Sequence, residues 1–102
     1  MFIKINADKN VANIHEAETL TAFEIRAIDG NAAKAATAIG NGAYVADNQH
    51  VWVPINWILD NVGEQVAQEW KKGFLNMVDY AKTKDWVNEE ETHLQAHIEI
   101  VS

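Results

Sequence analysis

The residues best suited to chemistry lie in the last segment of the chain, THLQAHIEIV at 92–101. An extended strand here would place the imidazole of His97 and the carboxylate of Glu99 on the same side. General acid–base catalysis needs little more than a histidine or a carboxylate in a cleft that excludes water. His97 and Glu99 are therefore the candidate catalytic residues, and whether the protein is an enzyme stays open.

A strand predicted at 20–29 would bring Glu24 and Arg26 to the face that carries His97 and Glu99. Such a cluster suits an acid–base site or the binding of a partner. Polar residues that alternate along the open face of a sheet are also ordinary, because cross-strand ion pairs form there. Both interpretations stay open at this stage.

The two C-terminal histidines do not indicate a metal site. His93 and His97 are spaced i, i+4, but on a strand they stand about 13 Å apart at roughly 3.3 Å per residue. His50 could approach one of them across the sheet, which the sequence does not decide. The acidic run at 89–91 lacks the ligand spacing of a calcium loop and is expected to be a solvated turn. We therefore expect no metal and no cofactor.

Residues that are missing or rare exclude several chemistries. Ser102 is the only serine and the chain has no cysteine, which removes Ser–His and Cys–His nucleophiles. Arg26 is the only arginine, so a clamp of several arginines on a phosphate cannot form. The GNG at 40–42 does not continue into a dinucleotide fingerprint, and we interpret it as a turn.

Strands and helices alternate along the chain. Strands are predicted where apolar residues alternate or form short runs, at 2–5, 20–29, 43–55 (a hairpin) and 92–101. Helices are predicted from helical spacing and end signals, at 31–39, 55–62 and 64 to about 84. The segment 8–18 is expected to be a loop or one short helix. The order β-β-α-β-β-α-α-β predicts a single α+β domain over 1–102, with one mainly antiparallel sheet and helices packed on one face.

The aromatic segment WKKGFLNMVDYAKTKDW at 70–86 is mostly one face of the last helix. At 100° per residue it forms an apolar stripe, made of Val66, Trp70, Phe74, Met77, Tyr80 and Ala81. Leu75 points away from this stripe and is a candidate contact residue. Gly73 lies beside the stripe, where glycine costs about 1 kcal/mol relative to alanine, so we expect it to admit a neighbouring group or to form a pocket floor. Trp86 is expected to fold back over the helix end.

The chain has four tryptophans among 102 residues. Trp52 in the hairpin and Trp57, out of register with the apolar face of its helix, are candidate binding residues, because tryptophan often lines a cleft. All four could instead belong to the core or its edge. Leu75, Glu24 and Arg26 complete the predicted binding residues.

The net charge of −7 comes from fifteen acidic and eight basic residues. It argues against nucleic acid, because proteins bind phosphates through Lys and Arg, and against an anionic membrane surface. The lack of cysteine, of a signal-like N-terminal segment and of a long apolar run favours the cytoplasm.

These observations favour a small acidic module that binds another protein or itself, with a small-molecule ligand among the tryptophans left open. The alternative is a small cofactor-free acid–base enzyme, of isomerase or hydratase type, with a tryptophan-lined pocket. A structural domain that only oligomerises through its exposed sheet face is a third interpretation.

Overall fold

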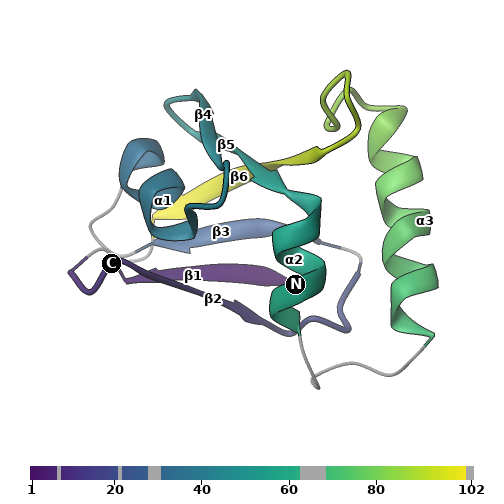
Figure 1. Ribbon diagram of the computed structural model, residues 1–102, viewed down its shortest axis with the longest axis horizontal. Coiled ribbons are helices and arrows are strands. Elements are labelled where there is room, and N and C mark those ends of the chain that lie inside the picture. The colour runs from purple at the N-terminus through teal and green to yellow at the C-terminus, as the bar shows by residue number, and fades with distance from the viewer. Residues whose placement is uncertain (7, 21, 28–30, 63–68, 101–102) are drawn as a thin grey trace.

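The computed structural model describes residues 1–6, 8–20, 22–27, 31–62 and 69–100. Within these ranges, six strands form one sheet in the order β2-β1-β3-β6-β5-β4 (Figure 1). The strands are β1 (Phe2–Asn6), β2 (Val11–His15), β3 (Glu24–Ala27), β4 (Tyr44–Asp47), β5 (His50–Pro54) and β6 (His93–Ile100). The fold is therefore α+β, as the sequence predicts.

The sheet is mixed, so the prediction of a mainly antiparallel sheet was wrong. The β1–β2, β4–β5 and β5–β6 pairs are antiparallel, whereas β3 runs parallel to both of its neighbours, β1 and β6. The hairpins are local and can be read from turn signals. The position of β3 between β1 and β6 depends on contacts far apart in the sequence, which local patterns do not encode.

The prediction for 8–18 was also wrong, because 11–15 form strand β2. Ile14 is 5 % exposed and pairs with Ile3, while Val11 at the sheet edge is 39 % exposed. An edge strand with only one buried apolar side chain gives a weak alternation signal. Asn10 has φ of 54° in the tight connection from β1, a conformation that asparagine tolerates better than most residues.

Within the described ranges, three helices lie in the predicted helical segments. They are α1 (Ala32–Ile39), α2 (Ile55–Val62) and α3 (Trp70–Lys82). The side chain of Asn31 accepts a hydrogen bond from the backbone of Lys34 at 2.9 Å and caps α1. Gly40 ends α1 with φ of 61°, which glycine adopts without steric cost. The predicted beginning of the last helix, including Val66, lies outside the described residues, as do Thr21 and Ile28 of the predicted strand 20–29.

The core lies on one face of the sheet. Alternate strand residues are fully buried there, namely Ile3, Ile25, Val51, Val53 and Ala96. Helices α1 and α2 lie in front of the sheet and contact its strands, whereas α3 stands beside it (Figure 1). The opposite face, here the open face, carries half-buried or exposed side chains, namely Phe2, Lys4, Glu24, Arg26, Trp52, Gln95, His97 and Glu99.

Helix α3 buries a narrower stripe than predicted. Its buried residues are Trp70, Phe74, Val78 and Ala81. Met77 is half-buried, and Tyr80, predicted in the stripe, is 58 % exposed. Helix α3 packs on its neighbours with one side only, so the edge of the stripe that carries Met77 and Tyr80 is left uncovered.

None of the helices in the described residues has the length and apolar character of a membrane span.

Trp70 fixes α3 to the rest of the molecule. Its ring stacks on Phe74 with centroids 4.9 Å apart, and its indole N–H donates to the carbonyl of Ala17 at 2.5 Å. The indole is thus both packed and hydrogen-bonded, as a buried tryptophan requires. Gly73 also serves this packing, because a Cβ there would lie 3.0 Å from a methyl group of Leu20.

Replacing Trp70 with alanine should lower the free energy of unfolding by about 3–5 kcal/mol. The loss combines a cavity with an unpaired Ala17 carbonyl. Leu75, on the same helix but 43 % exposed, supplies the control, and Leu75→Ala should change stability by less than about 0.5 kcal/mol. Denaturant unfolding measures both, and a loss below about 1 kcal/mol for Trp70→Ala would show that this side of α3 is not core.

Candidate functional site

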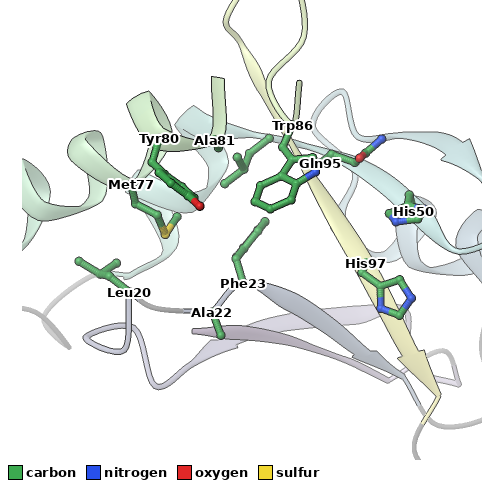
Figure 2. Close-up of a pocket in the computed structure, with 11 residues that line it drawn as sticks. Leu20, Ala22, Phe23, His50, Met77, Tyr80, Ala81, Trp86, Gln95 and His97 are labelled. Carbon is green, nitrogen blue, oxygen red and sulfur yellow. The ribbon is translucent and has the colours of Figure 1, made fainter. Parts of the chain in front are cut away.

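A cleft of about 370 Å³ opens where α3, the segment leading into β3 and one end of the open face meet (Figure 2). Its volume is in the range of small-molecule sites. Most of its lining is apolar, and the polar groups gather toward the sheet. The lining residues are Leu20, Ala22, Phe23, His50, Met77, Tyr80, Ala81, Trp86, Leu94, Gln95 and His97.

Three aromatic rings from separate segments surround the cleft. Phe23 precedes β3, Tyr80 comes from α3 and Trp86 follows α3, and Figure 2 shows the three around one hollow. Tyr80 and Trp86 are 58 % and 46 % exposed. Two large aromatic side chains are thus exposed at one cleft, and exposed apolar surface of this kind is a candidate for binding.

The backbone around Trp86 holds its ring in place. Its N–H donates to the carbonyl of Ala81 at 3.0 Å, and its carbonyl accepts from the N–H of Gln95 at 2.7 Å. The chain therefore joins the end of α3 to β6 at this residue. As predicted, Trp86 folds back over the helix end, where it lines the cleft beside Ala81. The ring is presented by a fixed backbone, which lowers the entropy cost of binding.

The turn after Trp86 is fixed by side chains. Asn88 accepts hydrogen bonds from the backbone of Thr92 and His93 at 2.8 and 2.9 Å. The acidic run 89–91 forms this turn, and Glu91 pairs with Lys82 of α3 at 2.6 Å. The nearby carboxylates, Glu91 first and Asp79 second, raise the pKa of Lys82.

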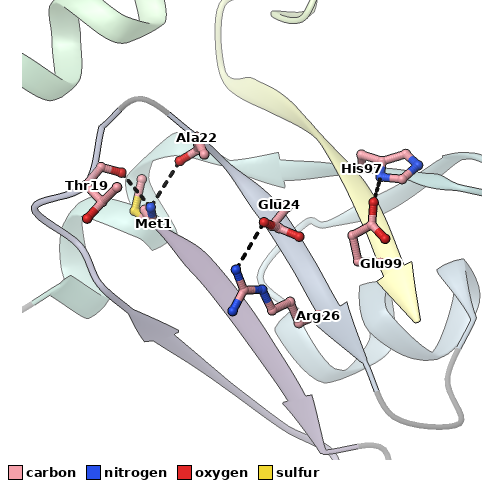
Figure 3. Close-up of polar contacts among 7 residues, drawn as sticks. All are labelled: Met1, Thr19, Ala22, Glu24, Arg26, His97 and Glu99. Carbon is pink, nitrogen blue, oxygen red and sulfur yellow. Dashed lines mark hydrogen bonds and ion pairs between the residues drawn. The ribbon is translucent and has the colours of Figure 1, made fainter. Parts of the chain in front are cut away.

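The second wall of the cleft is held by the N-terminal amine. The amine of Met1 donates to the carbonyls of Thr19 and Ala22 at 2.5 and 3.0 Å (Figure 3). These carbonyls flank Leu20, which lines the cleft and rests over Gly73. Burial lowers the pKa of the amine, and the acidic side chains nearby oppose that shift.

Two carboxylate–imidazole pairs lie at the polar end of the cleft. His97 Nδ1 is 3.3 Å from Glu99 Oε1, and His50 Nδ1 is 2.8 Å from Asp47 Oδ1. His50 and His97 face each other across β5 and β6, with ring centroids 5.2 Å apart. Of the two neutral tautomers of each imidazole, the one with its proton on Nδ1 fits a carboxylate at this position, and its Nε2 is then an acceptor.

The remaining candidates lie beside His97 on the open face. The parallel register sets Glu24 opposite His97 and Arg26 opposite Glu99, so the four predicted side chains do gather on one face (Figure 3). Arg26 pairs with Glu24 at 3.3 Å and lies 3.8 Å from the centre of the Phe2 ring. Because the Arg26 guanidinium already contacts Glu24 and the Phe2 ring, it has fewer donors available to a ligand than a guanidinium without such contacts.

The histidines do not form a multi-ligand metal site in the described part of the chain. His93 faces a different hollow, where its Nε2 bonds the carbonyl of Gly42 at 2.9 Å and its Nδ1 bonds the Thr92 hydroxyl at 2.8 Å. Both of its ring nitrogens are therefore occupied. Across the described residues, no group of three or more His, Asp or Glu has the geometry to hold an ion.

The structure separates the other predicted binding residues. Trp57 is buried at 8 % exposure, Trp52 is half-buried on the open face beside Tyr44, and Leu75 is exposed on α3. None of these three is among the residues that line the cleft.

Sequence reasoning instead missed Phe23, Tyr80 and Trp86 as one group. Their meeting depends on how α3 lies against the segment before β3, and the only local signal was the position of Trp86 outside the helical stripe.

The titration of Asp47 can test the carboxylate–imidazole pair. Hydrogen bonds from the backbone N–H of Gln49 first and from His50 second lower the pKa of Asp47 from its ordinary 3.8. His50→Ala should therefore raise this pKa only part of the way back, measured by NMR of the carboxyl carbon.

The same shift sets the pH range in which Asp47 stabilises the fold. Because its folded-state pKa is lowered, its contribution is present above the ordinary value and disappears as pH falls through the folded-state value. Asp47→Asn should thus lower stability at neutral pH, and this difference should shrink as the pH falls below 3.8. A difference that keeps the same size over this range would contradict this assignment.

Comparison with known proteins identifies no relative. No protein-family model, no curated protein and no solved structure matches the chain. Its function must therefore be argued from the cleft and the open face.

Proposed function

We propose that this domain is a protein-interaction module that works by binding, with the cleft as its anchor site. The observation that carries the proposal is the pair of half-exposed aromatic residues, Tyr80 and Trp86, at a preformed cleft beside an uncovered sheet face. Interfaces commonly depend on a few aromatic anchors in pockets, surrounded by a polar rim. Here the cleft would supply the pocket, and the open face with Glu24, Arg26 and Glu99 would supply the rim.

The charge of the chain favours a basic partner. Fifteen acidic and eight basic residues give a net charge of −7, and such a field speeds association with a positively charged surface. The partner is another protein that presents a basic surface. A second copy of this chain, which carries the same net charge of −7, would have to associate through its open face or a sheet edge instead. We place this activity in the cytoplasm, since a chain without cysteine suits a reducing compartment.

A peptide-display selection tests the module directly. Peptides selected on the wild-type protein at low salt should bind the Trp86→Ala variant at least about tenfold more weakly than wild type. The variant lacks an aromatic side chain that the bound peptide would cover. Leu75→Ala is the matched control, since Leu75 has similar exposure to Trp86 but lies outside the cleft. The association rate of the selected peptides with the protein should fall as the salt concentration rises.

Sedimentation of the free protein would add the self-association test. Selected peptides that bind Trp86→Ala and wild type equally would remove the cleft as the anchor. A monomer that selects no peptide, from libraries with unmodified lysine and from libraries with methylated lysine, would contradict the module as a whole.

A second candidate is a cofactor-free acid–base enzyme, favoured by the Glu99–His97 pair at the cleft. A carboxylate that orients a histidine is a common arrangement for a general base. His97 would remove a proton from a substrate whose apolar part lies against Tyr80 and Trp86. The exposure of the His97 side chain, at 45 %, fits binding better than catalysis, because a general base works best in a site that excludes water.

Proton exchange would distinguish the enzyme. In deuterated water, a panel of small apolar ketones and keto acids should gain deuterium beside the carbonyl if His97 is the base. His97→Gln should abolish this exchange, and Glu99→Gln should slow it by about tenfold to a hundredfold, as removal of an orienting group does. The binding module predicts no exchange above the rate in buffer.

A further inference from the structure

We propose that the aromatic end of the cleft binds an alkylated ammonium group, carried by a methylated lysine of the protein partner. This rests on the proposed function and specifies the side chain that the cleft accepts. The three rings of Phe23, Tyr80 and Trp86 around one hollow form the binding element. Aromatic faces attract cations through the negative potential of the ring, and several rings around one cavity are suited to quaternary ammonium groups.

The rings are free for such a role because they are not used in stacking on each other. Among the described residues, the stacked pairs lie elsewhere, with Trp70 on Phe74 and Phe2 on His15. Figure 2 shows Tyr80 and Trp86 on opposite sides of the hollow, with Phe23 below them. A compact cation placed between them would meet more than one ring.

The chain itself already places a cation against one of these rings. Lys84 Nζ lies 5.8 Å from the centroid of the Tyr80 ring. Lys84 is not among the residues that line the cleft, so its ammonium approaches Tyr80 at the rim. It shows that the ring is accessible to an ammonium group, and its charge would weaken the binding of a second cation nearby.

The rest of the lining explains why the ammonium should be alkylated. An unmodified lysine ammonium has three hydrogen-bond donors and is strongly hydrated. Among the described lining residues there is no Asp or Glu to pair with it, and the neighbours of the rings are Leu20, Met77 and Ala81. Methyl groups on the nitrogen remove donors and pack on these apolar side chains. The net charge of −7 adds a favourable long-range field for a cation.

Choline and 3,3-dimethylbutan-1-ol provide the test, because they have the same shape and differ in charge. Their affinities can be measured from chemical shifts of the backbone amides of Phe23, Tyr80 and Gln95, which line the cleft and are retained in every variant. Choline should bind about threefold to tenfold more tightly than the neutral alcohol. Trp86→Leu keeps an apolar wall but removes one of the three ring faces, and should reduce this preference at least about twofold.

Two further variants serve as controls. Lys84→Gln should strengthen the binding of choline and leave that of the alcohol unchanged, whereas Leu75→Ala should alter neither. Thermal unfolding of each variant checks that the fold is kept. Equal affinity for choline and the alcohol in the wild type, or a preference that Trp86→Leu leaves unchanged, would overturn the inference.

The source of the ammonium is tested with larger probes. A basic peptide with one trimethyllysine should bind more tightly than the same peptide with unmodified lysine, and phosphatidylcholine vesicles should not bind. Binding of vesicles but not of the methylated peptide would overturn the assignment to a protein partner. The proposed function has its own test. It would be contradicted if peptides selected by display bound wild type and Trp86→Ala with equal affinity, whether or not choline binds.

Discussion

The pairing of β6 with β3 on one side and β5 on the other positions the polar groups of the cleft, His50, Gln95 and His97. Side chains alternate along a strand, so a slip of one residue would exchange its two faces. Leu94, Ala96 and Ile98 are almost fully buried on the core face, which makes such a slip costly because it would place His97 in the core. Their burial thus keeps Gln95, His97 and Glu99 on the open face. The same strand holds the carbonyl of Trp86 through the N–H of Gln95.

Helix α3 depends on a different kind of attachment. It stands beside the sheet (Figure 1), and its indole hydrogen bond from Trp70 to Ala17 joins it to the segment after β2. A helix that covers a sheet buries a wide stripe, whereas this one leaves the edge with Met77 and Tyr80 in contact with the cleft. The cleft therefore exists because α3 is attached along one line rather than across a broad face.

Much of the fold could be predicted from the sequence, because its local signals are strong. The caps of α1, the alternation of β6 and the β4–β5 hairpin all lie within a few residues of the groups that specify them. The mixed sheet could not be predicted, since the place of β3 depends on partners more than 60 residues apart along the chain, such as Ile25 and Ile98. The edge strand β2 was missed because only Ile14 among its residues is buried.

The candidate site was predictable only in part, for the same reason. The register of β3 and β6 brings His97, Glu99, Glu24 and Arg26 to one face, as alternation indicates. The aromatic wall was not predictable, because burial of Tyr80 depends on where the whole of α3 lies. Helical spacing gives the direction of a side chain but not whether another element covers it.

Gly73 makes the shape of the cleft easy to change by mutation. The nearest group to its missing side chain is the end of Leu20, which also forms part of the cleft wall. A Cβ at position 73 would lie 3.0 Å from Leu20, so a larger residue there would require the Leu20 side chain to shift and would change the shape of this wall. The shape of the cleft therefore depends on residue 73, whereas its recognition chemistry depends on the aromatic rings and the histidines. A single substitution at position 73 could change which groups fit the cleft without replacing any of those side chains.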